Sequence, residues 1–487
     1  MAPPPDLTRG ADVTLTDQLA ARYAERITQR LLPAGARLPS VRECARRHAV
    51  SASTVVAAYD RLLAQGLIVA RRQRGFFVRD ALRAPVPGET APVPGEAAPV
   101  PAHGLAPLSA TTLMRGMFQP PGAQPMPGLG TLPVDWLDAG LLAAALRRVS
   151  AAAQVGALAL RYGEPAGDAR LRRALALRLA DLGIHADAGQ IVSTVGATQA
   201  LDVVTRALAR AGDAVLVDEP GWPVEYARLE ALGLTVLPVP RGDEGPDLGV
   251  MEQLLRAHAP RLYITVSVLH NPTGHSLSLA RAHRLLGLAQ QHGLTIVEDD
   301  SYAHFAPAHL PRLAALDSLQ RTVYVSGFSK ILAPGWRVGF IAAPAALVDR
   351  FVDTRLLASL TTPALAEQAV AHCLESGLLR RHAERIGARL DAARVRTVRL
   401  AEAAGCRFAA PPRGLFGWVD AGMDTERLAR RLLDDGGWLV APGALFHARQ
   451  RPSTLMRINF ATAQEQRFWR ALERARDEGR GSQFSAS

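Results

Sequence analysis

One residue in this chain can do chemistry that no other side chain of the sequence can do. Lys330 is the only lysine, although 56 of the 487 residues are lysine or arginine. A lysine amine can lose its proton and attack an aldehyde to form a Schiff base, whereas the guanidinium of arginine stays protonated. We therefore expect Lys330 to be a catalytic or cofactor-binding nucleophile. The alternative is chance survival of one lysine in an arginine-biased sequence.

Several other segments carry polar groups that could act beside such a lysine, and some of them follow an expected strand. The segment Gly196-Ala197-Thr198 opens an expected helix, so its backbone N–H groups and the positive end of the helix dipole can bind a phosphate. Asp299 ends another expected strand. The remaining segments contain Trp222, Asn271, Tyr302, Ser329, Arg337 and Arg457. Each segment alone is weak evidence, and the interpretation depends on their joint order and spacing.

The elements that must position these residues alternate between short apolar runs and helical patterns. Such alternation favours a mainly parallel sheet that is covered by helices on both faces. We expect its strands at Gln190–Val195, Ala214–Asp218, Leu234–Val239, Arg261–Val266, Leu294–Glu298 and Thr322–Ser326. From about Phe351 the pattern predicts a smaller α/β lobe with strands at Leu415–Asp420 and Leu455–Asn459.

With its motifs in this order, this part of the chain resembles the fold-type I aminotransferases, which bind pyridoxal 5′-phosphate. The resemblance implies that Lys330 forms an aldimine with the cofactor. It also implies that Asp299 pairs with the pyridinium nitrogen, which keeps the ring able to withdraw electrons. Trp222, where tyrosine is more usual, would stack on the ring. Asn271 and Tyr302 would contact the phenolic oxygen.

The resemblance also assigns the phosphate end of the cofactor. Arg337, Ser329, Thr198 and the backbone N–H of Ala197 would bind the phosphate. Gly327 departs from the family, which usually has serine or threonine at this position. Phosphate binding would therefore depend more on arginine and on backbone N–H groups.

Two further positions match the family at the substrate and at the partner subunit. Arg457 falls where the family binds a substrate α-carboxylate by a two-pronged ion pair. Tyr162 matches a tyrosine that reaches the cofactor of the other subunit, so the resemblance implies a homodimer.

The N-terminal segment predicts three short helices and a β-hairpin. The core side of the first helix recurs every four residues, at Leu19, Tyr23, Ile27 and Leu31. A second helix is expected to begin at Ser40, which forms a capping-box pattern with Glu43, and a third at Ser51. Two strands are expected to flank a basic turn, at Leu67–Ala70 and Phe76–Arg79.

This segment is also strongly basic. Residues 1–83 contain 14 arginines against seven acidic residues, a net charge of +7 out of +11 for the chain, which fits a polyanionic partner. A solvated arginine-rich face is the alternative. The motifs resemble the GntR-type winged helix, whose third helix enters the major groove. The resemblance implies contacts to a double-stranded DNA operator from Arg42, Ser51, Ser53, Thr54, Arg71, Arg72 and Arg74. Ala52 departs from the family, which commonly has arginine there.

Composition divides the chain into three expected parts. Residues 12–80 are the winged helix-turn-helix, residues 81–128 are a linker rich in proline, glycine and alanine, and residues 129–480 are the aminotransferase-like domain. As a flexible coil the linker would span roughly 40 Å. This layout resembles the MocR family of regulators, whose large domain dimerises head to tail and senses the cofactor, or the cofactor with an amine.

Composition also excludes some classes. Cys44, Cys373 and Cys406 are widely spaced, so we expect neither a disulfide framework nor a metal site. The sequence has no run of the roughly 18 apolar residues that a membrane helix needs. Its first residues lack the layout of a signal peptide. We therefore expect a cytoplasmic protein without membrane contact.

The function is interpreted as that of a pyridoxal-phosphate-dependent DNA-binding transcription regulator. It would sense the cofactor, or an amine or amino-acid effector, through an aldimine at Lys330. One alternative is an active aminotransferase with a fused DNA-binding domain, which Lys330, Asp299 and Arg457 support equally. Another is a DNA-binding protein whose large domain is only a dimerisation scaffold. The retained Lys330 counts against the scaffold, which needs no Schiff-base amine.

Overall fold

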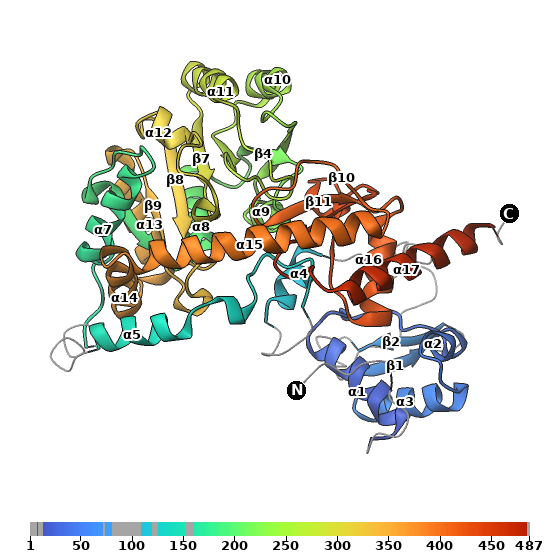
Figure 1. Cartoon of the computed structure of the whole chain (residues 1–487). Helices are drawn as coiled ribbons and strands as arrows, with labels where there is room; N and C mark the ends of the chain where they lie inside the picture. Colours follow the sequence, from blue (N-terminus) through green and yellow to red (C-terminus); the bar gives the residue numbers. More distant parts are fainter. Residues whose placement is uncertain are drawn as a thin grey trace, which may run out of the picture. The chain divides into compact units, whose positions relative to one another are not determined.

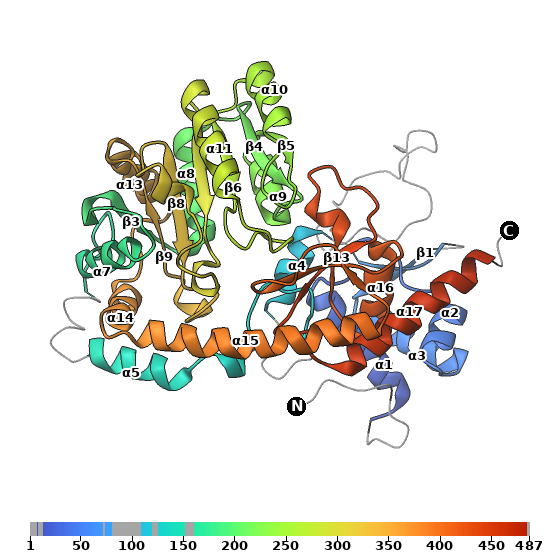
Figure 2. The same ribbon diagram turned by 45° about the horizontal axis from the view of Figure 1, so that its top comes forward.

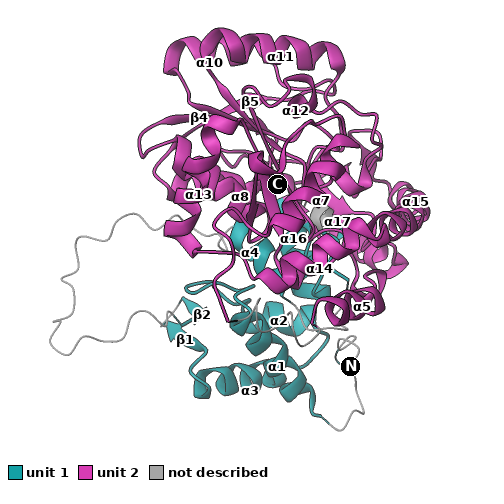
Figure 3. Ribbon diagram, turned by 90° about the vertical axis from the view of Figure 1, so that its left-hand side faces the viewer, with its two compact units in different colours: residues 1–129, 426–440, 477–487 teal, residues 130–425, 441–476 magenta. Residues whose placement is uncertain are grey.

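The computed structural model describes residues 7, 13–71, 74–79, 109–118, 125–150 and 160–484. The chain divides into two compact units, which Figure 3 colours separately. Unit 1 comprises residues 1–129, 426–440 and 477–487, and unit 2 comprises residues 130–425 and 441–476. Each unit therefore contains segments that are far apart in the sequence.

A winged helix forms the N-terminal part of unit 1 (Figure 1). Its elements are α1 Leu15–Thr28, α2 Val41–Arg47, α3 Ala52–Ala64, β1 Ile68–Arg71 and β2 Gly75–Val78. Each helix begins after a residue whose side-chain oxygen accepts a backbone N–H: Thr14, Ser40 and Ser51. Strands β1 and β2 pair antiparallel. The three predicted helices and the hairpin are confirmed.

The winged helix has its own hydrophobic core. Leu19 and Tyr23, on the predicted core side of α1, are 0% and 1% exposed, and Val55 and Tyr59 of α3 are fully buried. The rings of Tyr23 and Tyr59 meet edge to face with centroids 5.9 Å apart. The Tyr59 hydroxyl donates a hydrogen bond to the carbonyl of Pro39 at 2.9 Å. This core holds α3 against the residues that precede α2.

Three more helical segments belong wholly or partly to unit 1. They are α4 Ala110–Gly116, nearly all of α16 Thr425–Gly436, and the end of α17 Gln466–Phe484. Helix α4 lies within the segment predicted as a linker, and it begins with a capping box at Ser109. It packs closely on the segment after α16, because a Cβ at Gly116 would overlap the side chain of Leu439.

Unit 2 is built on a seven-stranded sheet with the order β3-β9-β8-β7-β6-β4-β5 (Figure 2). The strands are β3 Ile191–Thr194, β4 Ala214–Glu219, β5 Thr235–Pro240, β6 Leu262–Thr265, β7 Thr295–Asp299, β8 Thr322–Gly327 and β9 Gly339–Ala342. Neighbours pair in parallel except at β9, which pairs antiparallel with β3 and β8. The six predicted strands are confirmed to within one residue at each end.

Strand β9 was not predicted. Between β8 and β9 the chain forms only turns and the short 3-10 helix η4, Pro334–Trp336. The other strands were predicted because they alternate with longer helices. No such helix precedes β9, so the pattern did not reveal it.

Two apolar clusters lie on opposite faces of this sheet. Val215 and Val217 of β4 face one cluster, and Leu216 faces the other, because successive side chains of a strand point to opposite faces. The first cluster includes residues of α8 Gly196–Leu208, α9 Pro223–Ala231 and α13 Ala345–Ser359. The second includes residues of α10 Leu248–His258, α11 Leu279–His292 and α12 Leu313–Leu316. The predicted helix-covered, mainly parallel sheet is confirmed.

A smaller antiparallel sheet has the order β10-β11-β13-β12. Its strands are β10 Arg407–Phe408, β11 Phe416–Asp420, β12 Ala441–Pro442 and β13 Leu455–Asn459. The two predicted strands of the small lobe are thus confirmed, and the two-residue strands β10 and β12 were not predicted. The remaining helices of unit 2 are α5 Ala139–Val149, α7 Ala169–Ala180, α14 Ala364–Glu375 and α15 Leu378–Ala403, with the short 3-10 helices η1 Val134–Trp136, η2 Ala188–Gln190, η3 Ala303–Phe305 and η5 Gly443–Phe446.

None of the described helices combines the length and the apolar character that a membrane crossing requires. The described residues contain no cluster of histidine, cysteine, aspartate or glutamate side chains that could hold a metal ion. Cys44, Cys373 and Cys406 are buried thiols.

Candidate functional site

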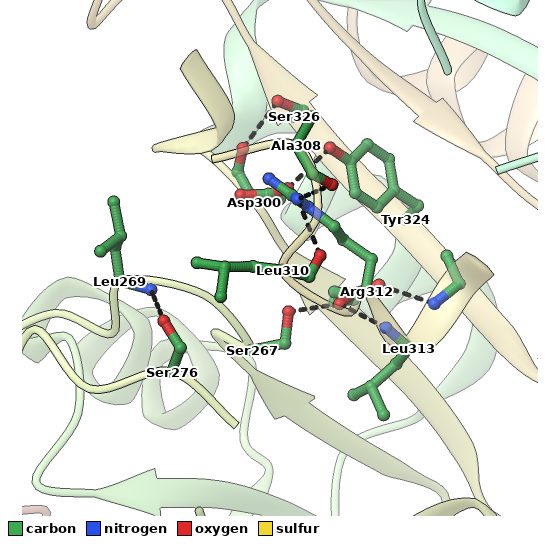
Figure 4. A network of polar contacts seen from close by, with 12 residues as sticks. Ser267, Leu269, Ser276, Asp300, Ala308, Leu310, Arg312, Leu313, Tyr324 and Ser326 are labelled. Carbon is green, nitrogen blue, oxygen red and sulfur yellow. Dashed lines mark hydrogen bonds and ion pairs between the residues drawn. The ribbon is translucent and has the colours of Figure 1, made fainter. Parts of the chain in front are cut away.

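Three consecutive acids at the end of β7 divide between two faces of the sheet. Glu298 accepts hydrogen bonds from the backbone N–H groups of Leu313 and of the next residue, each at 2.8 Å. Asp300 pairs with Arg312 at 3.0 Å in the polar network of Figure 4. Since side chains alternate along a strand, Asp299 points to the opposite face. Its two neighbours fix the strand end, and Asp299 lines a pocket of unit 2.

Asp299 is a buried carboxylate whose hydrogen-bond donors come from Ser301. It is 9% exposed and accepts hydrogen bonds from the Ser301 backbone N–H at 3.0 Å and the Ser301 hydroxyl at 2.5 Å. Burial raises the pKa of Asp299 to about 6, and the bonds from Ser301 oppose that rise. A buried carboxylate in this state gains stability from a positively charged partner.

Lys330 lies in the turn that follows β8. A Cβ at Gly130 would lie 3.6 Å from the Lys330 amine and 3.4 Å from the Phe416 ring, so the amine lies beside both residues. Burial and, to a smaller extent, the charge of Arg457 lower the pKa of Lys330 to about 8, and Asp299 opposes them. A much larger fraction of this amine is therefore neutral near pH 7 than of an ordinary lysine.

Helix α15 fixes the backbone next to Lys330. The His382 Nε2 atom lies 2.8 Å from the carbonyl oxygen of Ile331. Arg385 donates a hydrogen bond to His382 Nδ1 at 2.8 Å, so Nε2 is the nitrogen that carries the proton and donates to Ile331. Arg385 also pairs with Asp138 at 3.0 Å. The chain of contacts holds the turn that presents the amine.

Arg457 of β13 is buried beside this amine. Its guanidinium lies over the rings of Phe416 and Phe446, 4.4 and 5.2 Å from their centroids, and donates to Asn271 Oδ1 at 2.9 Å. Burial lowers the pKa of Arg457 to about 10, so the group remains a cation at neutral pH. Tyr302 packs edge to face on Phe416 at 5.2 Å, and burial raises the pKa of its hydroxyl. The fold thus gathers Asn271, Tyr302 and Arg457 around Lys330.

A second group of predicted residues meets at the start of α8. Gly196 adopts a positive φ of 78°, and Arg337 reaches this turn, where it donates to Ser329 Oγ at 2.9 Å and to the Val195 carbonyl at 3.2 Å. A helix N-terminus and a guanidinium are both positive, so together they form a binding site for an anion.

The backbones of β8 and β9 press directly against this turn. A Cβ at Gly327 would lie 3.3 Å from the backbone nitrogen of Ala197, and one at Gly339 would overlap Gly196. The departure at Gly327 therefore has a steric reason, since a larger side chain would push on the first turn of α8. Ala197 and Thr198 are half-buried there.

One pocket of unit 2 is lined by three of the predicted residues, Trp222, Asn271 and Asp299. Its other lining residues are Leu201, Val217, Asp218, Gly221, Glu225, Tyr226, Ile264, Thr265, Val266 and His270. The pocket has an aromatic ring, an amide and a carboxylate on its walls, which suits a planar polar ligand.

Asp218 is a buried site residue to which sequence analysis gave no role. Its carboxylate accepts hydrogen bonds from the Tyr263 hydroxyl at 2.5 Å, the Thr265 hydroxyl at 2.7 Å and Arg241 at 3.1 Å. This network fixes the end of β4 beside the pocket. Its partners come from two other segments of the chain, so no local spacing could reveal it.

The predicted DNA-reading residues of the helices lie at the starts of α2 and α3. Arg42, Ser51 and Ser53 are exposed, and Thr54 is half-buried. The Ser51 hydroxyl accepts from the Thr54 backbone N–H at 3.1 Å, so Ser51 also caps α3. Its hydroxyl lies 2.7 Å from that of Ser53. Arg42 and Ser53 therefore project most freely from this surface.

The wing carries two described arginines. Arg71 ends β1 with its guanidinium 4.7 Å from the centroid of the Phe77 ring, and Arg74 is exposed in the turn before β2. Arg72 lies outside the described residues. Stacking on an aromatic ring holds the Arg71 guanidinium at the surface in a defined place.

Tyr162 is not buried with the other predicted cofactor residues. It is 84% exposed, and the neighbouring Gly163 donates a backbone hydrogen bond to Thr361 at 3.2 Å. Leu357 and Leu360 are also exposed, at 92% and 51%. This surface of unit 2 thus combines an exposed aromatic ring with exposed aliphatic side chains.

Family models match both parts of the chain. The model described as aminotransferase class I and II matches residues 133–474, and the model described as bacterial regulatory proteins, gntR family, matches residues 15–78. The chain belongs to the aminotransferase class I and II family, to which it adds a GntR winged helix. This combination is that of the MocR-type regulators.

Similar proteins include both regulators and transaminases. The uncharacterized HTH-type transcriptional regulator YisV of Bacillus subtilis is 26% identical over 93% of this chain and 94% of its own length. The 2-aminoadipate transaminase of Thermus thermophilus is 31% identical over 63% of this chain and 78% of its own length. The crystal structure of α-aminoadipate aminotransferase from the same organism, complexed with N-(5′-phosphopyridoxyl)-L-leucine, matches with a TM-score of 0.65 and 28% identity. It covers 72% of this chain and 90% of that one.

Proposed function

We propose that the protein is a DNA-binding transcription regulator that binds pyridoxal 5′-phosphate at Lys330 and responds to the cofactor or to an amine or amino-acid effector. The observation that carries the proposal is the place of the only lysine. Lys330 is buried with its pKa lowered to about 8, in a domain of the aminotransferase fold on the same chain as a winged helix.

The phosphate end of the cofactor fits the turn at α8. Arg337 and Ser329 lie together there, and the first N–H groups of α8, at Ala197 and Thr198, have no partner within the helix. The cofactor phosphate would supply the negative charge that these groups can bind. Because Gly327 and Gly339 have no side chains, the turn at Gly196 and Ala197 can pack directly on the sheet. This backbone packing holds the first N–H groups of α8 in place.

The ring end fits the groups around Asp299. When bound, the cofactor would supply an aldehyde for the amine and a ring that withdraws electrons. Asp299 would hold a proton on the ring nitrogen, and this charge would keep Asp299 itself ionised. Asn271 and Tyr302 would hydrogen-bond the ring oxygen, and Trp222 would cover the ring and exclude water.

Lys330 and Arg457 would act on different parts of the site when an amine effector binds. The neutral form of Lys330 is the one that can bond to an aldehyde, and its lowered pKa makes that form available. Arg457 would orient an effector carboxylate by a charge-assisted pair of hydrogen bonds. To do so it would exchange its present bond to Asn271.

The winged helix would bind an operator in double-stranded DNA. Arg42, Ser53 and Thr54 lie where the N-terminal end of α3 can approach base edges, and Ser51 holds that end by its cap. Arg71, Arg72 and Arg74 of the wing would contact phosphates. DNA as the partner implies that the protein works in the cytoplasm.

A second copy of the chain would cover the surface around Tyr162. The exposed Tyr162, Leu357 and Leu360 offer an apolar area to which a partner can pack. In a head-to-tail homodimer Tyr162 would reach the partner's cofactor. The DNA reader would then be residues 12–80, the linker residues 81–128, and the effector sensor residues 129–480.

The purified protein tests the cofactor half of this proposal. We expect it to take up pyridoxal phosphate and turn yellow, and borohydride should fix the cofactor on Lys330. Peptide mapping is unambiguous because Lys330 is the only lysine side chain. A protein that stays colourless in excess cofactor would contradict the proposal.

An active aminotransferase is the second candidate, and one observation favours it. Arg457 lies in the same buried site as Lys330, which is the arrangement that a substrate carboxylate needs. Turnover of amino-acid and keto-acid pairs at about 1 per second or faster would favour the enzyme. Operator binding that changes with cofactor in the absence of such turnover would favour the regulator.

A further inference from the structure

We propose that Glu225, held by Arg228, is a positioning residue of the cofactor pocket that controls the charge of Asp299. The inference rests on the proposed function, in which Asp299 pairs with the ring nitrogen of the cofactor. Glu225 is a buried residue of α9 to which sequence analysis gave no role. The charge of Asp299 matters because a protonated ring nitrogen is bound best by an ionised carboxylate.

Three acids line the pocket that contains Asp299. Asp218 and Glu225 line it together with Asp299, and the basic residue among its described lining residues is His270. Burial lowers the pKa of His270 well below its usual range, so this imidazole is neutral near pH 7. The pocket walls therefore present negative charge beside the Trp222 ring, which favours a flat ligand that carries a proton.

The charges of these three acids are compensated in different ways. Asp218 pairs with Arg241 at 3.1 Å. Glu225 pairs with Arg228 through both carboxylate oxygens, at 2.5 Å from Nη2 and 3.2 Å from Nε. Asp299 instead accepts its hydrogen bonds from a neutral serine. Its charge is therefore the one that depends most on neighbouring groups.

The pair of Glu225 and Arg228 presents its negative end to the pocket. Glu225 is 5% exposed and lines the pocket. Arg228 is not among the described lining residues and reaches α8, where it donates to the Thr205 hydroxyl at 2.9 Å and lies 3.5 Å from Asp202. The carboxylate of Glu225 is thus the part of the pair that Asp299 meets across the pocket.

This arrangement disfavours the ionised form of Asp299. Burial raises the pKa of Asp299 to about 6, the bonds from Ser301 oppose this rise, and the charge of Glu225 adds to it. Like charges that share a pocket make each other harder to ionise, and the guanidinium of Arg228 reduces the charge that Asp299 experiences. A stronger or weaker pair of Glu225 and Arg228 would therefore change the charge of Asp299 at a given pH.

Other titratable groups face the two acids from the elements packed around them. Asp300, which follows Asp299, raises its pKa as well, and Lys330 faces Asp299 from the turn after β8. Further groups near the two acids are Tyr302 after β7, Tyr226 of α9, Asp218 and Glu219 of β4 with Arg241, His270 after β6, and Asp202 and Arg206 of α8. The variants below leave all of these groups unchanged, so their comparison reports on Glu225 and Arg228.

Binding of pyridoxine 5′-phosphate at different pH values tests the proposal. This ligand has the ring nitrogen and the phosphate of the cofactor but no aldehyde, so its binding does not involve a bond to Lys330. Wild-type affinity should fall as pH decreases through about 6, because Asp299 becomes protonated. In Glu225→Gln the fall should move to lower pH by at least about 0.5 unit, because a like charge is removed. Isothermal titration calorimetry of the full-length proteins between about pH 5 and 8 measures this profile.

Two further variants separate this role from a structural one. Arg228→Gln leaves the charge of Glu225 without its guanidinium, so its profile should move to higher pH, opposite to that of Glu225→Gln. Glu230 is an exposed acid of the same helix, so Glu230→Gln should keep the wild-type profile. Damage to α9 alone would weaken binding at every pH. A wild-type profile in Glu225→Gln, or shifts of Glu225→Gln and Arg228→Gln in the same direction, would overturn the role of Glu225.

The apoprotein provides a test that needs no ligand. The thermal unfolding midpoint is measured for Asp299→Asn, for Glu225→Gln and for the double variant. Near pH 7 Asp299→Asn should raise the midpoint more when Glu225 is present, and near pH 5 this difference should vanish because Asp299 is then protonated. Additive changes at both pH values would overturn the proposal. If the wild type took up no pyridoxal phosphate, the proposed function would fail, while these midpoints would still decide whether Glu225 controls the charge of Asp299.

Discussion

The two candidate sites of this chain present their polar groups in opposite ways. Around Lys330 the amine, Asp299 and Arg457 are buried, and burial is the first cause of each pKa shift. At the start of α3, Ser51 and Ser53 are exposed. A buried constellation is preorganised for one small charged ligand, whereas an exposed basic surface suits a long polyanion bound through many weak contacts. The comparison predicts that single changes have larger effects at the buried site.

The largest expected effect is that of Lys330→Ala. Because this is the only lysine, the variant should form no borohydride-stable adduct of pyridoxal phosphate with a side chain. Mass spectrometry of the reduced protein measures this. Lys330→Arg is the matched control, because it restores a cation but not a nucleophile, and it should behave like the alanine variant. An adduct of wild-type yield in either variant would contradict the assignment.

A smaller loss is expected for Asp299→Ala. Removal of a charge-assisted bond to the ring nitrogen should weaken cofactor binding by roughly 10- to 100-fold. Absorbance titration with pyridoxal phosphate gives the affinity. Asp300→Asn, whose side chain belongs to the network with Arg312, serves as a comparison for indirect structural effects. Equal affinity in Asp299→Ala and the wild type would remove Asp299 from the site.

At the exposed surface, Arg42→Ala should weaken operator binding by about tenfold. Its cofactor spectrum should stay that of the wild type, because Arg42 is an exposed residue of the winged helix, which has its own hydrophobic core. Fluorescence anisotropy at several salt concentrations measures both affinity and the salt slope. If affinity does not depend on salt, the proposed phosphate contacts are wrong.

The smallest expected effect concerns the pH at which Lys330 reacts. The Lys330 pKa is lowered to about 8, so the neutral, reactive amine increases as pH rises through 8. Arg457→Gln removes a positive charge that lowers this pKa, so the pKa should rise and the rate of cofactor attachment at pH 7 should fall about two- to fivefold. Arg457→Lys, which keeps the charge, should stay near the wild type. The measurement is a pH profile of the attachment rate. If the profile of Arg457→Gln equals that of the wild type, the charge of Arg457 does not lower the Lys330 pKa.

Much of the fold was predictable because its signals are local. The alternation of apolar runs with helices predicted six strands of the large sheet, and the caps at Ser40 and Ser51 predicted two helix starts. Strand β9 was missed because it follows β8 without a crossover of helical length. Helix α4, with its capping box at Ser109, was hidden in a proline-rich segment.

The candidate site was predictable only where motifs mark strand ends and turns. Asp299 and Lys330 were predicted in this way. Gly130 and Phe416, which lie beside the amine, were missed because they are far from it in sequence and belong to no motif. The carboxylate network of Asp218 was missed for the same reason. Tertiary packing brings these residues together, and no local pattern records it.

The most direct test of the central claim is an operator titration with and without pyridoxal phosphate, done with the wild type and with Lys330→Ala. The account predicts that cofactor changes the operator affinity of the wild type and leaves that of Lys330→Ala unchanged, while both proteins bind the operator. If Lys330→Ala responded to the cofactor as the wild type does, sensing through Lys330 would be contradicted.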